Sequence, residues 1–587
     1  MPRFERALVI VPPNITYNNF RFPTKNTKSW LHPSGVELGV IITDVPLGAL
    51  TIAEWLKEKH SIPTQLLDFN VEIHKTWNHI NDDSFEPWLR DSLEALDFVP
   101  DLIGFSSLFV TGYKNLFLLG KICSEMFPAA TTIVGGNLAT TMYGEIFDDD
   151  REEFFDALCF GEGELPLEEL IGSTDSKAYL DSSPHWITRN SYKTSQFEHL
   201  FIEDLDEIPP LNYELLSVSD YQHSPTIKAY TQIEDTTNYI TYMTSRGCPF
   251  LCTFCSAHTV HGRKMRYFSL ERIAKELRDL QSVNNANTLV IEDDHFLSDN
   301  DRAKGVLRIA RELGLKCVFP NALALYGLDR SMLRVLSSCG VRQLTLAVES
   351  GSPRVLKKLM KKPLRIDITE RVAKDCYEMG IYTDCNIIIG MPGETMDDIA
   401  VAREFLRELP ANWYRINVAT PLAGSEMYEV ALENRQMVGD VREAGYKSCV
   451  IETEHFTPEQ INEVAYSMNL ELNFVHNTDM QMDNFERAIE SFDNVLALKH
   501  DHAFALFFKG KCLEALGQTE AARETLSVAS SLFTNDPVWN FYYIHFGLEI
   551  ENLEVPYTSH DLEKSKKFFF SVTSSGIGRG IPAVNVA

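Results

Sequence analysis

The chain has 587 residues, of which 44% are hydrophobic and 23% are charged, and its formal net charge is −29. A chain of this length usually contains about three or four domains. The composition is that of a globular protein and argues against long disordered regions. Because nucleic-acid phosphates and anionic membrane surfaces repel an acidic chain, we expect neither of them as a partner.

The cysteine content predicts a reduced, cytoplasmic protein. Of the eleven cysteines only three are clustered, and an odd number without a pairing pattern argues against an oxidised secreted framework. Residues 1–14 contain only a brief apolar run, and no stretch is long enough for a membrane-spanning helix. One basic run, 354–365, departs from the acidic character of the chain, and we interpret it as a solvated helix face.

Residues 1–172 alternate short apolar runs with helical patterns, which predicts a doubly wound, Rossmann-like parallel sheet. The predicted strands are 7–13, 63–70, 101–108, 131–137 and 157–164, with helices that include 47–60 and 111–126. Ligands bind beyond the carboxyl ends of the strands in such sheets. The candidate cofactor-binding residues at these ends are small or polar: Ser106, Ser107, Gly135, Gly136, Gly161, Glu162 and Gly163.

Residues 173–230 carry Ser, Asp and Pro clusters and predict a surface linker. Residues 231–445 contain a second βα series with candidate strands at 239–247, 288–294, 316–322, 343–351, 383–394 and 414–424. Helical patterns follow at 269–283, 299–314, 329–339, 366–380 and 395–408. Six βα units are too few for a closed eight-stranded barrel, so we expect a partial (βα)6 barrel with its chemistry at the carboxyl ends of the strands.

Residues 446–587 are expected to form an all-α domain. Ala488 and Ala522 are 34 residues apart, and two further pairs of apolar residues share this offset. A 34-residue period is typical of tetratricopeptide repeats, of which we predict two to three at about 461–550. An ordinary helical bundle is the alternative.

The stretch "RGCPFLCTFCSAH" (246–258) holds Cys248, Cys252 and Cys255 directly after the first strand of the second series. Soft thiolates suit zinc or iron–sulfur clusters. A structural zinc site needs a fourth ligand, which His258 or His261 could supply. The alternative is a [4Fe–4S] cluster with one open iron, because clusters that only carry electrons usually have four cysteines.

Carboxylates end the second strand of this series, in "IEDDHF" (291–296). Glu292, Asp293 and Asp294 could accept charge-assisted hydrogen bonds from an ammonium group. Equally, the acids of this segment could cap the following helix.

"RGCPFLCTFC" resembles the signature of the radical S-adenosylmethionine (SAM) enzymes, and residues 238–445 resemble the partial barrel of that family. The resemblance implies that the three cysteines bind a [4Fe–4S] cluster whose open iron is chelated by the methionine part of SAM. It also implies that Phe254 lies against the adenine and that Glu349 contacts the ribose. Gly390, Pro392 and Gly393 in "NIIIGMPGE" (386–394) would line SAM.

A doubly wound domain before such a barrel resembles the cobalamin-binding subclass of this family. The segments that carry the resemblance are 45–56, 135–137 and 160–164, and they imply cobalamin as a further cofactor. The D-x-H-x-x-G motif, whose His ligates cobalt, is missing, and His74 lies in a different setting. The lower face of the cobalt would then be unligated or held by another group.

The resemblance implies a cobalamin-dependent methyltransferase that cleaves SAM reductively and methylates an unactivated carbon. A non-methylating cyclisation, rearrangement or oxidation is the alternative within the same fold. A recruiting scaffold, in which the helical tail carries the function, is the alternative from another class. The expected partners are SAM, a small-molecule, lipid or peptide substrate, an external electron donor, and a protein or carrier bound by the tail.

Overall fold

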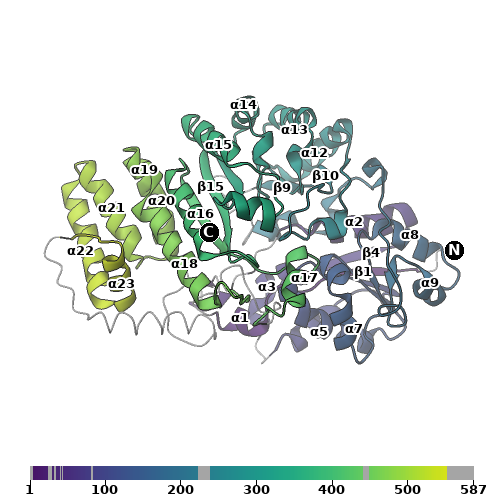
Figure 1. Cartoon of the computed structure of the whole chain (residues 1–587). Coiled ribbons are helices and arrows are strands. Elements are labelled where there is room, and N and C mark those ends of the chain that lie inside the picture. Colours follow the sequence, from purple (N-terminus) through teal and green to yellow (C-terminus); the bar gives the residue numbers. More distant parts are fainter. Residues whose placement is uncertain are drawn as a thin grey trace.

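The computed structural model describes residues 4–23, 29–31, 35–39, 41, 44–80, 84–222, 238–439 and 449–550. An N-terminal α/β unit, a central α/β unit and a helical tail follow one another along the chain (Figure 1). The predicted fold class, α/β with parallel sheets and an all-α C-terminal region, is confirmed. The two α/β units pack face to face, and the tail lies against the far side of the central unit.

The N-terminal sheet has the strand order β4-β1-β5-β6-β7-β8, and its strands are parallel except for β8. They are β1 (Ala7–Val11), β4 (Thr64–Asp68), β5 (Leu102–Ser106), β6 (Thr131–Gly135), β7 (Ala157–Cys159) and β8 (Trp186–Ile187). Every residue of the run ALVIV in β1 is buried, as expected for a strand covered on both faces. A short hairpin, β2 (Ser29–Leu31) and β3 (Glu37–Gly39), lies outside this sheet.

Helices cover both faces of the N-terminal sheet. They are α1 (Tyr17–Arg21), α2 (Leu47–Glu54), α3 (Phe69–Thr76), α4 (Glu86–Glu94), α5 (Tyr113–Met126), α6 (Asn137–Thr141), α7 (Tyr143–Asp149), α8 (Glu164–Gly172) and α9 (Ser176–Ser182). Two apolar clusters, one on each side of the sheet, form the core of the unit.

The central unit consists of two three-stranded parallel sheets, β9-β12-β13 and β14-β15-β16, which a bridge between Leu323 and Leu346 joins. The strands are β9 (Tyr239–Tyr242), β12 (Thr288–Ile291), β13 (Lys316–Val318), β14 (Gln343–Glu349), β15 (Tyr382–Ile389) and β16 (Trp413–Val418). The short strands β10 (Ser245–Arg246) and β11 (Arg266–Tyr267) pair beyond the end of β9. All six predicted strands are present, and the barrel they form is open.

Five helices of the central unit pack on the outside of the open barrel: α12 (Leu270–Asn284), α13 (Asn300–Glu312), α14 (Arg330–Ser338), α15 (Ile366–Glu378) and α16 (Met396–Glu408). Two further helices, α11 (His258–His261) and α17 (Glu426–Glu433), face the N-terminal unit, where α11 packs against α6 and Tyr428 of α17 joins the apolar core. Along β14, Leu344, Leu346 and Val348 pack in the core shared with the five outer helices. Since side chains alternate along a strand, Thr345 points into the barrel, and Glu349, which follows a shift in the strand register, is also buried.

Part of the segment predicted as a surface linker is buried. Residues 176–187 form α9 and the sixth strand of the N-terminal sheet, and Ile202, Leu205 and Ile208 pack in the core of the central unit. The Tyr213 hydroxyl donates to the Thr241 carbonyl on β9 over 2.8 Å, so this segment covers the outer edge of the first barrel strand. The end of the predicted linker, 223–230, lies outside the described residues.

The tail completes the other edge of the barrel. α18 (Pro458–Leu470) packs against β16, the last strand. Directly after this helix, the Asn473 side chain accepts from the Tyr414 N–H over 2.8 Å and donates to the Tyr414 carbonyl over 2.9 Å. One asparagine thus satisfies backbone groups that a further strand would otherwise pair.

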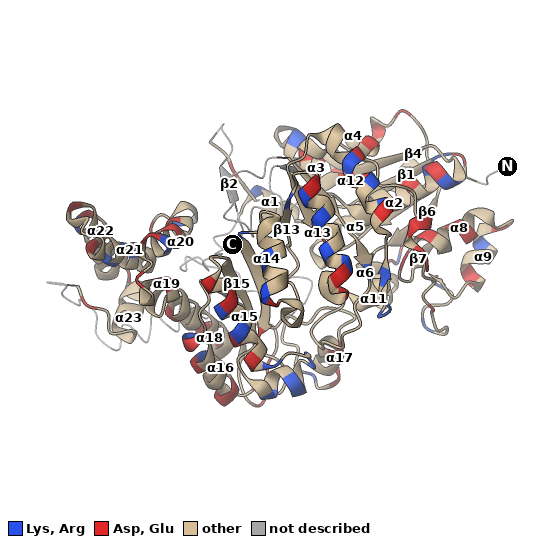
Figure 2. Cartoon of the chain, turned by 90° about the horizontal axis from the view of Figure 1, so that it is seen from above, with Lys and Arg blue, Asp and Glu red and all other residues tan. Residues whose placement is uncertain are grey.

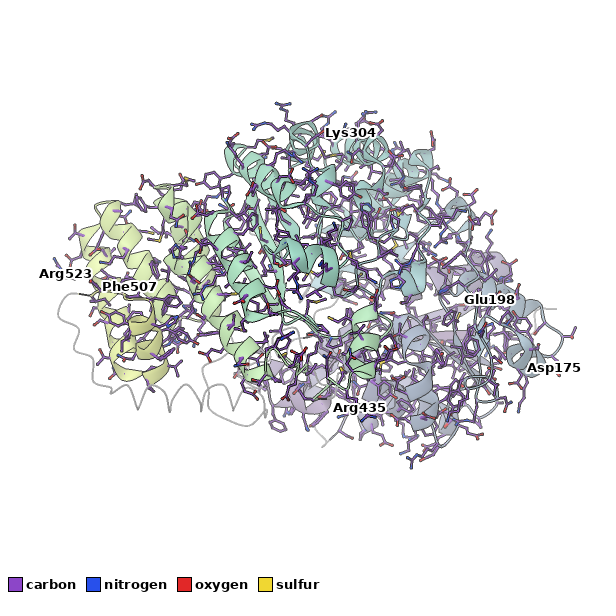
Figure 3. The ribbon with its side chains drawn as sticks, in the orientation of Figure 1. Asp175, Glu198, Lys304, Arg435, Phe507 and Arg523 are labelled. Atoms are coloured by element: carbon purple, nitrogen blue, oxygen red, sulfur yellow. The ribbon has the colours of Figure 1, made fainter. Side chains whose placement is uncertain are left out.

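The remaining tail helices are α19 (Thr478–Gln481), α20 (Phe485–Leu498), α21 (Ala503–Ala515), α22 (Thr519–Asn535) and α23 (Pro537–His545). The starts of α20 and α22 are 34 residues apart, as are those of α21 and α23, and Ala488 and Ala522 are buried. Phe507 lies in the aromatic core of the tail, whereas Arg523 projects from its outer surface (Figure 3). The assignment to tetratricopeptide repeats stays a prediction, and residues 446–448 and 551–587 lie outside the described residues.

Among the helices of the described residues, none combines the length and the hydropathy that a membrane span requires.

The tail contains a buried histidine that should make its stability depend on pH. His502 accepts from the Ala505 N–H at the start of α21, and burial lowers its pKa to about 3. The unfolded chain binds this proton near a pKa of about 6.5, so stability is lost as the pH falls below that value. We expect His502→Asn, which keeps the capping acceptor, to reduce the loss of thermal stability between pH 7 and pH 5. Equal losses of Tm in the two proteins would contradict this.

Candidate active site

The three clustered cysteines lie on the loop between β10 and α11, beyond the carboxyl end of β9. Their thiols are free and half-buried. Burial raises the pKa of Cys248 to about 11, and it also raises the pKa values of Cys252 and Cys255. Such thiols stay protonated at neutral pH until a metal displaces the proton, so their environment favours a metal-bound thiolate over a free nucleophile.

Backbone hydrogen bonds hold the cysteine loop from two sides. The Thr253 N–H donates to the Met360 carbonyl over 3.0 Å, and its hydroxyl donates to the Leu359 carbonyl over 2.7 Å. The Met427 N–H donates to the Thr253 carbonyl over 2.8 Å. The segments that follow β14 and β16 therefore fix the middle of the loop between Cys252 and Cys255.

The zinc alternative finds no geometric support. Among the described residues, no group of three His, Cys, Asp or Glu side chains converges on a point where one metal ion could be held. His261 Nδ1 lies 3.0 Å from Glu162 Oε1 and is thus engaged elsewhere. In a polynuclear cluster each thiolate binds a different iron, so three cysteines need not converge on one point.

Glu349 and Lys362 form an ion pair beside the cysteine loop. Their charged atoms, Oε1 and Nζ, are 3.2 Å apart, and the Lys362 side chain is only 16% exposed. The ammonium lies 5.9 Å from the centroid of the Phe254 ring, and its charge favours the thiolates of Cys252 and Cys255. Glu349 itself has a φ of 63°, a conformation that costs energy for a residue with a side chain.

Lys362 is the residue of this site that sequence reasoning missed. It belongs to the basic run 354–365, which the sequence predicted to be solvated, and Lys357 and Lys358 in the same run are indeed exposed. The residue before it, Lys361, has a φ of 48°, which turns the chain and directs the next side chain inward. No residue spacing in a single sequence marks such a turn.

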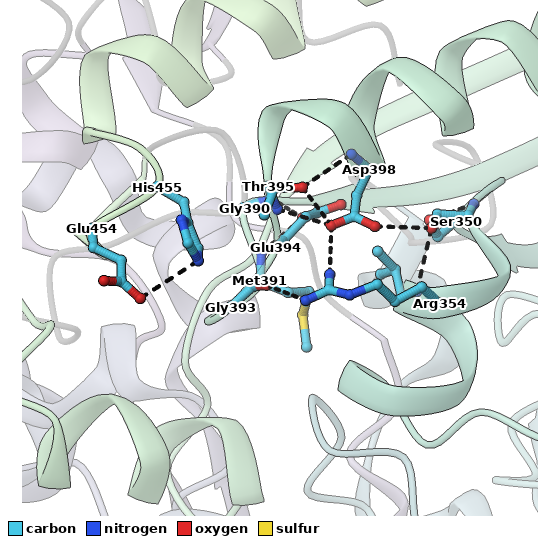
Figure 4. Close-up of polar contacts among 12 residues, drawn as sticks. Ser350, Arg354, Gly390, Met391, Gly393, Glu394, Thr395, Asp398, Glu454 and His455 are labelled. Atoms are coloured by element: carbon cyan, nitrogen blue, oxygen red, sulfur yellow. Dashed lines mark hydrogen bonds and ion pairs between the residues drawn. The ribbon is translucent and has the colours of Figure 1, made fainter.

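The loop after β15 is shaped by two glycines and a buried acid. Gly390 and Gly393 have φ values of 87° and 80°, which only glycine adopts readily. Glu394 Oε2 accepts from the N–H groups of Gly390, over 2.7 Å, and Met391, over 3.0 Å, and burial raises the Glu394 pKa to about 7 (Figure 4). Pro392 stiffens the turn between them.

An arginine joins this loop to the basic run. Arg354 donates to the Gly393 carbonyl over 3.1 Å and pairs with Asp398 (Figure 4). The backbone of the loop is therefore fixed from both sides.

The three acids after β12 have different environments. Asp293 accepts from the Thr244 N–H and hydroxyl, each over 2.6 Å, so it supports the chain leading to the cysteines. Glu292 lies in the barrel near Asn321, and burial, reinforced by Asp44, raises its pKa to about 8. One carboxylate oxygen of Asp294 is buried without a hydrogen-bond partner. Only Glu292 and Asp294 retain capacity for a ligand.

The carboxyl edge of the N-terminal sheet presents Ser106, Ser107, Gly135 and Gly136 together. Ser106 pairs in register with Gly135, and the Ser107 N–H donates to the Gly135 carbonyl over 2.9 Å. A Cβ on Gly135 would meet nothing within 4 Å, so the sheet edge is open at this point. The next residues after Ser107, Leu108 and Phe109, are 55% and 51% exposed.

Gly161, Glu162 and Gly163, at the end of β7, are occupied by protein contacts. His199 packs on Gly161, and Ile52 packs on Gly163. Glu162 is buried and accepts from Arg266 over 2.6 and 2.8 Å. The carboxylate of Glu162 therefore joins the two α/β units, and protein groups occupy both of its oxygens.

Arg246 extends this network to the cysteine loop, since it lies two residues before Cys248. It is 3.4 Å from Glu162 and 2.7 Å from Glu164. Burial alone would raise the pKa of Glu162, but the charge of Arg246 and the hydrogen bonds from Arg266 and His261 outweigh burial. The pKa of Glu162 therefore lies well below its usual range.

Residues 242–406 match the family model of the radical SAM superfamily. The chain therefore contains a radical SAM domain. The match begins at the end of β9 and covers the cysteine loop, the Glu349–Lys362 pair and the glycine loop after β15.

Relatives of this radical SAM enzyme include methyltransferases. The cytidylyl-2-hydroxyethylphosphonate methyltransferase of Streptomyces wedmorensis is 28% identical over 474 residues, which cover 73% of this chain and 86% of the relative. The hopanoid C-3 methylase of Methylococcus capsulatus is 26% identical over 440 residues, with coverages of 74% and 78%.

Among solved structures, the cobalamin-dependent SAM radical enzyme OxsB with aqua-cobalamin and SAM bound has a TM-score of 0.58 and is 15% identical. The alignment covers 97% of this chain and 84% of OxsB, so the two share a fold over nearly the whole chain.

The donor set of this radical SAM enzyme fits a [4Fe–4S] cluster with one open iron. Three free thiols lie on one loop, and the other cysteines of the described residues are buried away from it. Lys362 supplies a cation next to two of the thiols, which offsets part of the negative charge of a thiolate-bound cluster.

We expect Glu162→Gln to lower the thermal stability of this radical SAM enzyme markedly. The substitution leaves Arg266 buried without its counter-ion, and breaking a buried pair costs about 3–5 kcal/mol. Glu203→Gln is the matched control, because its partner Lys264 is exposed and such a pair contributes about 0–1 kcal/mol. Differential scanning fluorimetry should show a lower Tm for the Glu162 variant alone, and equal shifts would contradict the assignment.

Proposed function

We propose that this chain is a cobalamin-dependent radical SAM methyltransferase that methylates an unactivated carbon of a small molecule. The observation that carries the proposal is the position of the cysteine loop. It lies at the mouth of the barrel and is tied through Glu162 to the carboxyl edge of the N-terminal sheet. A cofactor on that edge and a cofactor on the loop would thus face the same space.

The loop cysteines would hold the cluster, and when bound the cluster supplies the electron that cleaves SAM into methionine and a 5′-deoxyadenosyl radical. Phe254 would lie against the adenine, and the glycine loop of Gly390, Pro392 and Gly393 would let SAM approach the backbone closely. Glu349 would accept hydrogen bonds from the ribose hydroxyls.

Lys362 would bind the carboxylate of SAM. Its ammonium is 3.2 Å from Glu349, the proposed ribose contact, and its charge acts on two of the cluster ligands, Cys252 and Cys255. A buried ammonium is a strong partner for a carboxylate. Glu292 and Asp294 retain carboxylate oxygens that could receive an ammonium group from SAM or from the substrate.

Cobalamin would lie on the carboxyl edge of the N-terminal sheet and supply the methyl group. Ser106, Gly135 and Gly136 offer a surface without bulky side chains, whereas Ser107 is buried, and exposed Leu108 and Phe109 suit an apolar ring face. The homologous fold of OxsB, solved with aqua-cobalamin bound, supports this placement. Gly161, Glu162 and Gly163 would position the edge without contacting cobalamin.

The proposal is tested by anaerobic reconstitution with iron, sulfide and hydroxocobalamin, followed by addition of SAM and reductant. We expect 5′-deoxyadenosine, S-adenosylhomocysteine and methylcobalamin. Formation of 5′-deoxyadenosine by a protein that binds no cobalamin would contradict the methyltransferase proposal but would agree with radical cleavage of SAM. A Cys252→Ala protein that still cleaved SAM reductively would contradict both.

Replacing Lys362 by methionine should weaken SAM binding by about 10–100-fold, the loss expected when one hydrogen bond to a charged group, about 1.5–3 kcal/mol, is removed. Equilibrium dialysis of SAM on the reconstituted protein measures this directly. Lys361→Met is the control, because Lys361 is exposed and pairs with Glu426. Unchanged SAM affinity in the Lys362 variant, with iron content intact, would refute the assignment.

A further inference from the structure

The basic run 354–365 carries six cations within twelve residues of a chain whose net charge is −29. It follows β14 and contains a π-helical turn, Val355–Leu359. In Figure 2, blue segments gather between α16 and α17, whereas most of the charged residues on α16 and α18 are acidic and drawn red. The run is therefore a local positive feature on an acidic molecule.

Most of these cations are already paired. Arg354 pairs with Asp398, Lys361 with Glu426, Lys362 with Glu349, and Arg365 with Asp367. Lys357 and Lys358 are different, because both are exposed and neither forms an ion pair with any described residue. Two adjacent positive charges are thus exposed to solvent and have no ion-pair partner among the described residues.

The two free lysines lie one layer of side chains away from the cysteine loop. Their neighbours Val355, Leu356 and Met360 are buried in a small apolar cluster with Met391 and Met427, against which Phe254 packs. The carbonyl of Leu359, the residue after Lys358, accepts from the Thr253 hydroxyl over 2.7 Å. The surface around Lys357 and Lys358 is therefore a short route from solvent to the thiols.

We propose that Lys357 and Lys358 form the docking surface for a small acidic protein that carries a low-potential flavin or iron–sulfur centre. The inference rests on the reductive SAM cleavage proposed above, which consumes one electron from outside the chain in each cleavage. The reduced centre of the donor loses that electron, the cluster gains it and passes it to SAM, and the C5′–S bond breaks to give methionine and the 5′-deoxyadenosyl radical.

Charge complementarity decides both the partner and the place. An acidic donor is repelled by most of this chain, and two adjacent free lysines attract it more strongly than the single exposed lysines elsewhere. Electrostatic steering therefore favours this surface, which lies one layer of side chains from the cysteine loop. Such steering weakens as salt shortens the range of the field.

The test compares two reductants on the reconstituted full-length protein. The variant is Lys357→Glu/Lys358→Glu, and the matched control is Lys177→Glu/Lys275→Glu, which makes the same change in charge at exposed, unpaired lysines on α9 and α12. The rate of 5′-deoxyadenosine formation is measured with dithionite and, separately, with increasing concentrations of a bacterial flavodoxin kept reduced by its reductase and NADPH.

We expect the variant to keep its dithionite rate within about twofold while its KM for flavodoxin rises by about tenfold or more, with the control unchanged. The salt dependence of the wild-type KM should be lost in the variant. An unchanged flavodoxin KM would overturn the docking surface. Rates that fall equally with both reductants would show that the lysines only maintain the structure of the loop, and this result would also overturn the docking surface. A wild-type protein that forms no deoxyadenosine with dithionite would instead refute the radical reaction itself.

Discussion

The carboxylate of Glu162 fixes how the two α/β units face each other, and the rest of the proposed site depends on it. It lies three residues after the end of β7 in the N-terminal sheet, yet it is bonded to Arg266 and lies near Arg246 and His261 from the central unit. Burying such charges is costly unless each finds partners in good geometry, so the network tolerates only one arrangement of the two surfaces. Arg246 belongs to this network and lies two residues before Cys248, so the network also fixes the start of the cysteine loop.

An open barrel must also protect its outer strands. Tyr213, from the segment between the units, bonds the backbone of β9, and Asn473, from the tail, bonds the backbone of β16. Each contact satisfies polar groups at a strand edge that would otherwise invite pairing with another chain. The beginning of the tail is therefore part of the same folded unit as the barrel.

The sequence predicts most of the fold, because each strand and helix has its own short, regular spacing of apolar residues. The five N-terminal and six central strands were predicted close to their observed positions, and the cysteine spacing marked the metal-binding loop. The role of Lys362 could not be predicted, since it depends on a left-handed residue before it and on a partner thirteen residues away. Glu162 was expected to touch a cofactor, but its partners lie about a hundred residues further along the chain, a separation that no periodicity records.

Cofactors on the cysteine loop and on the carboxyl edge of the N-terminal sheet would lie close together in the proposed enzyme. Both proposed cofactors can be made paramagnetic, as a reduced [4Fe–4S] cluster and as cob(II)alamin. The direct measurement is the electron paramagnetic resonance spectrum of the reconstituted protein with both present, compared with the spectra of protein holding each one alone. If the proposed placement is right, the spectra are broadened by magnetic interaction between the two centres. A simple sum of the two separate spectra, with both cofactors stoichiometrically bound, would contradict it.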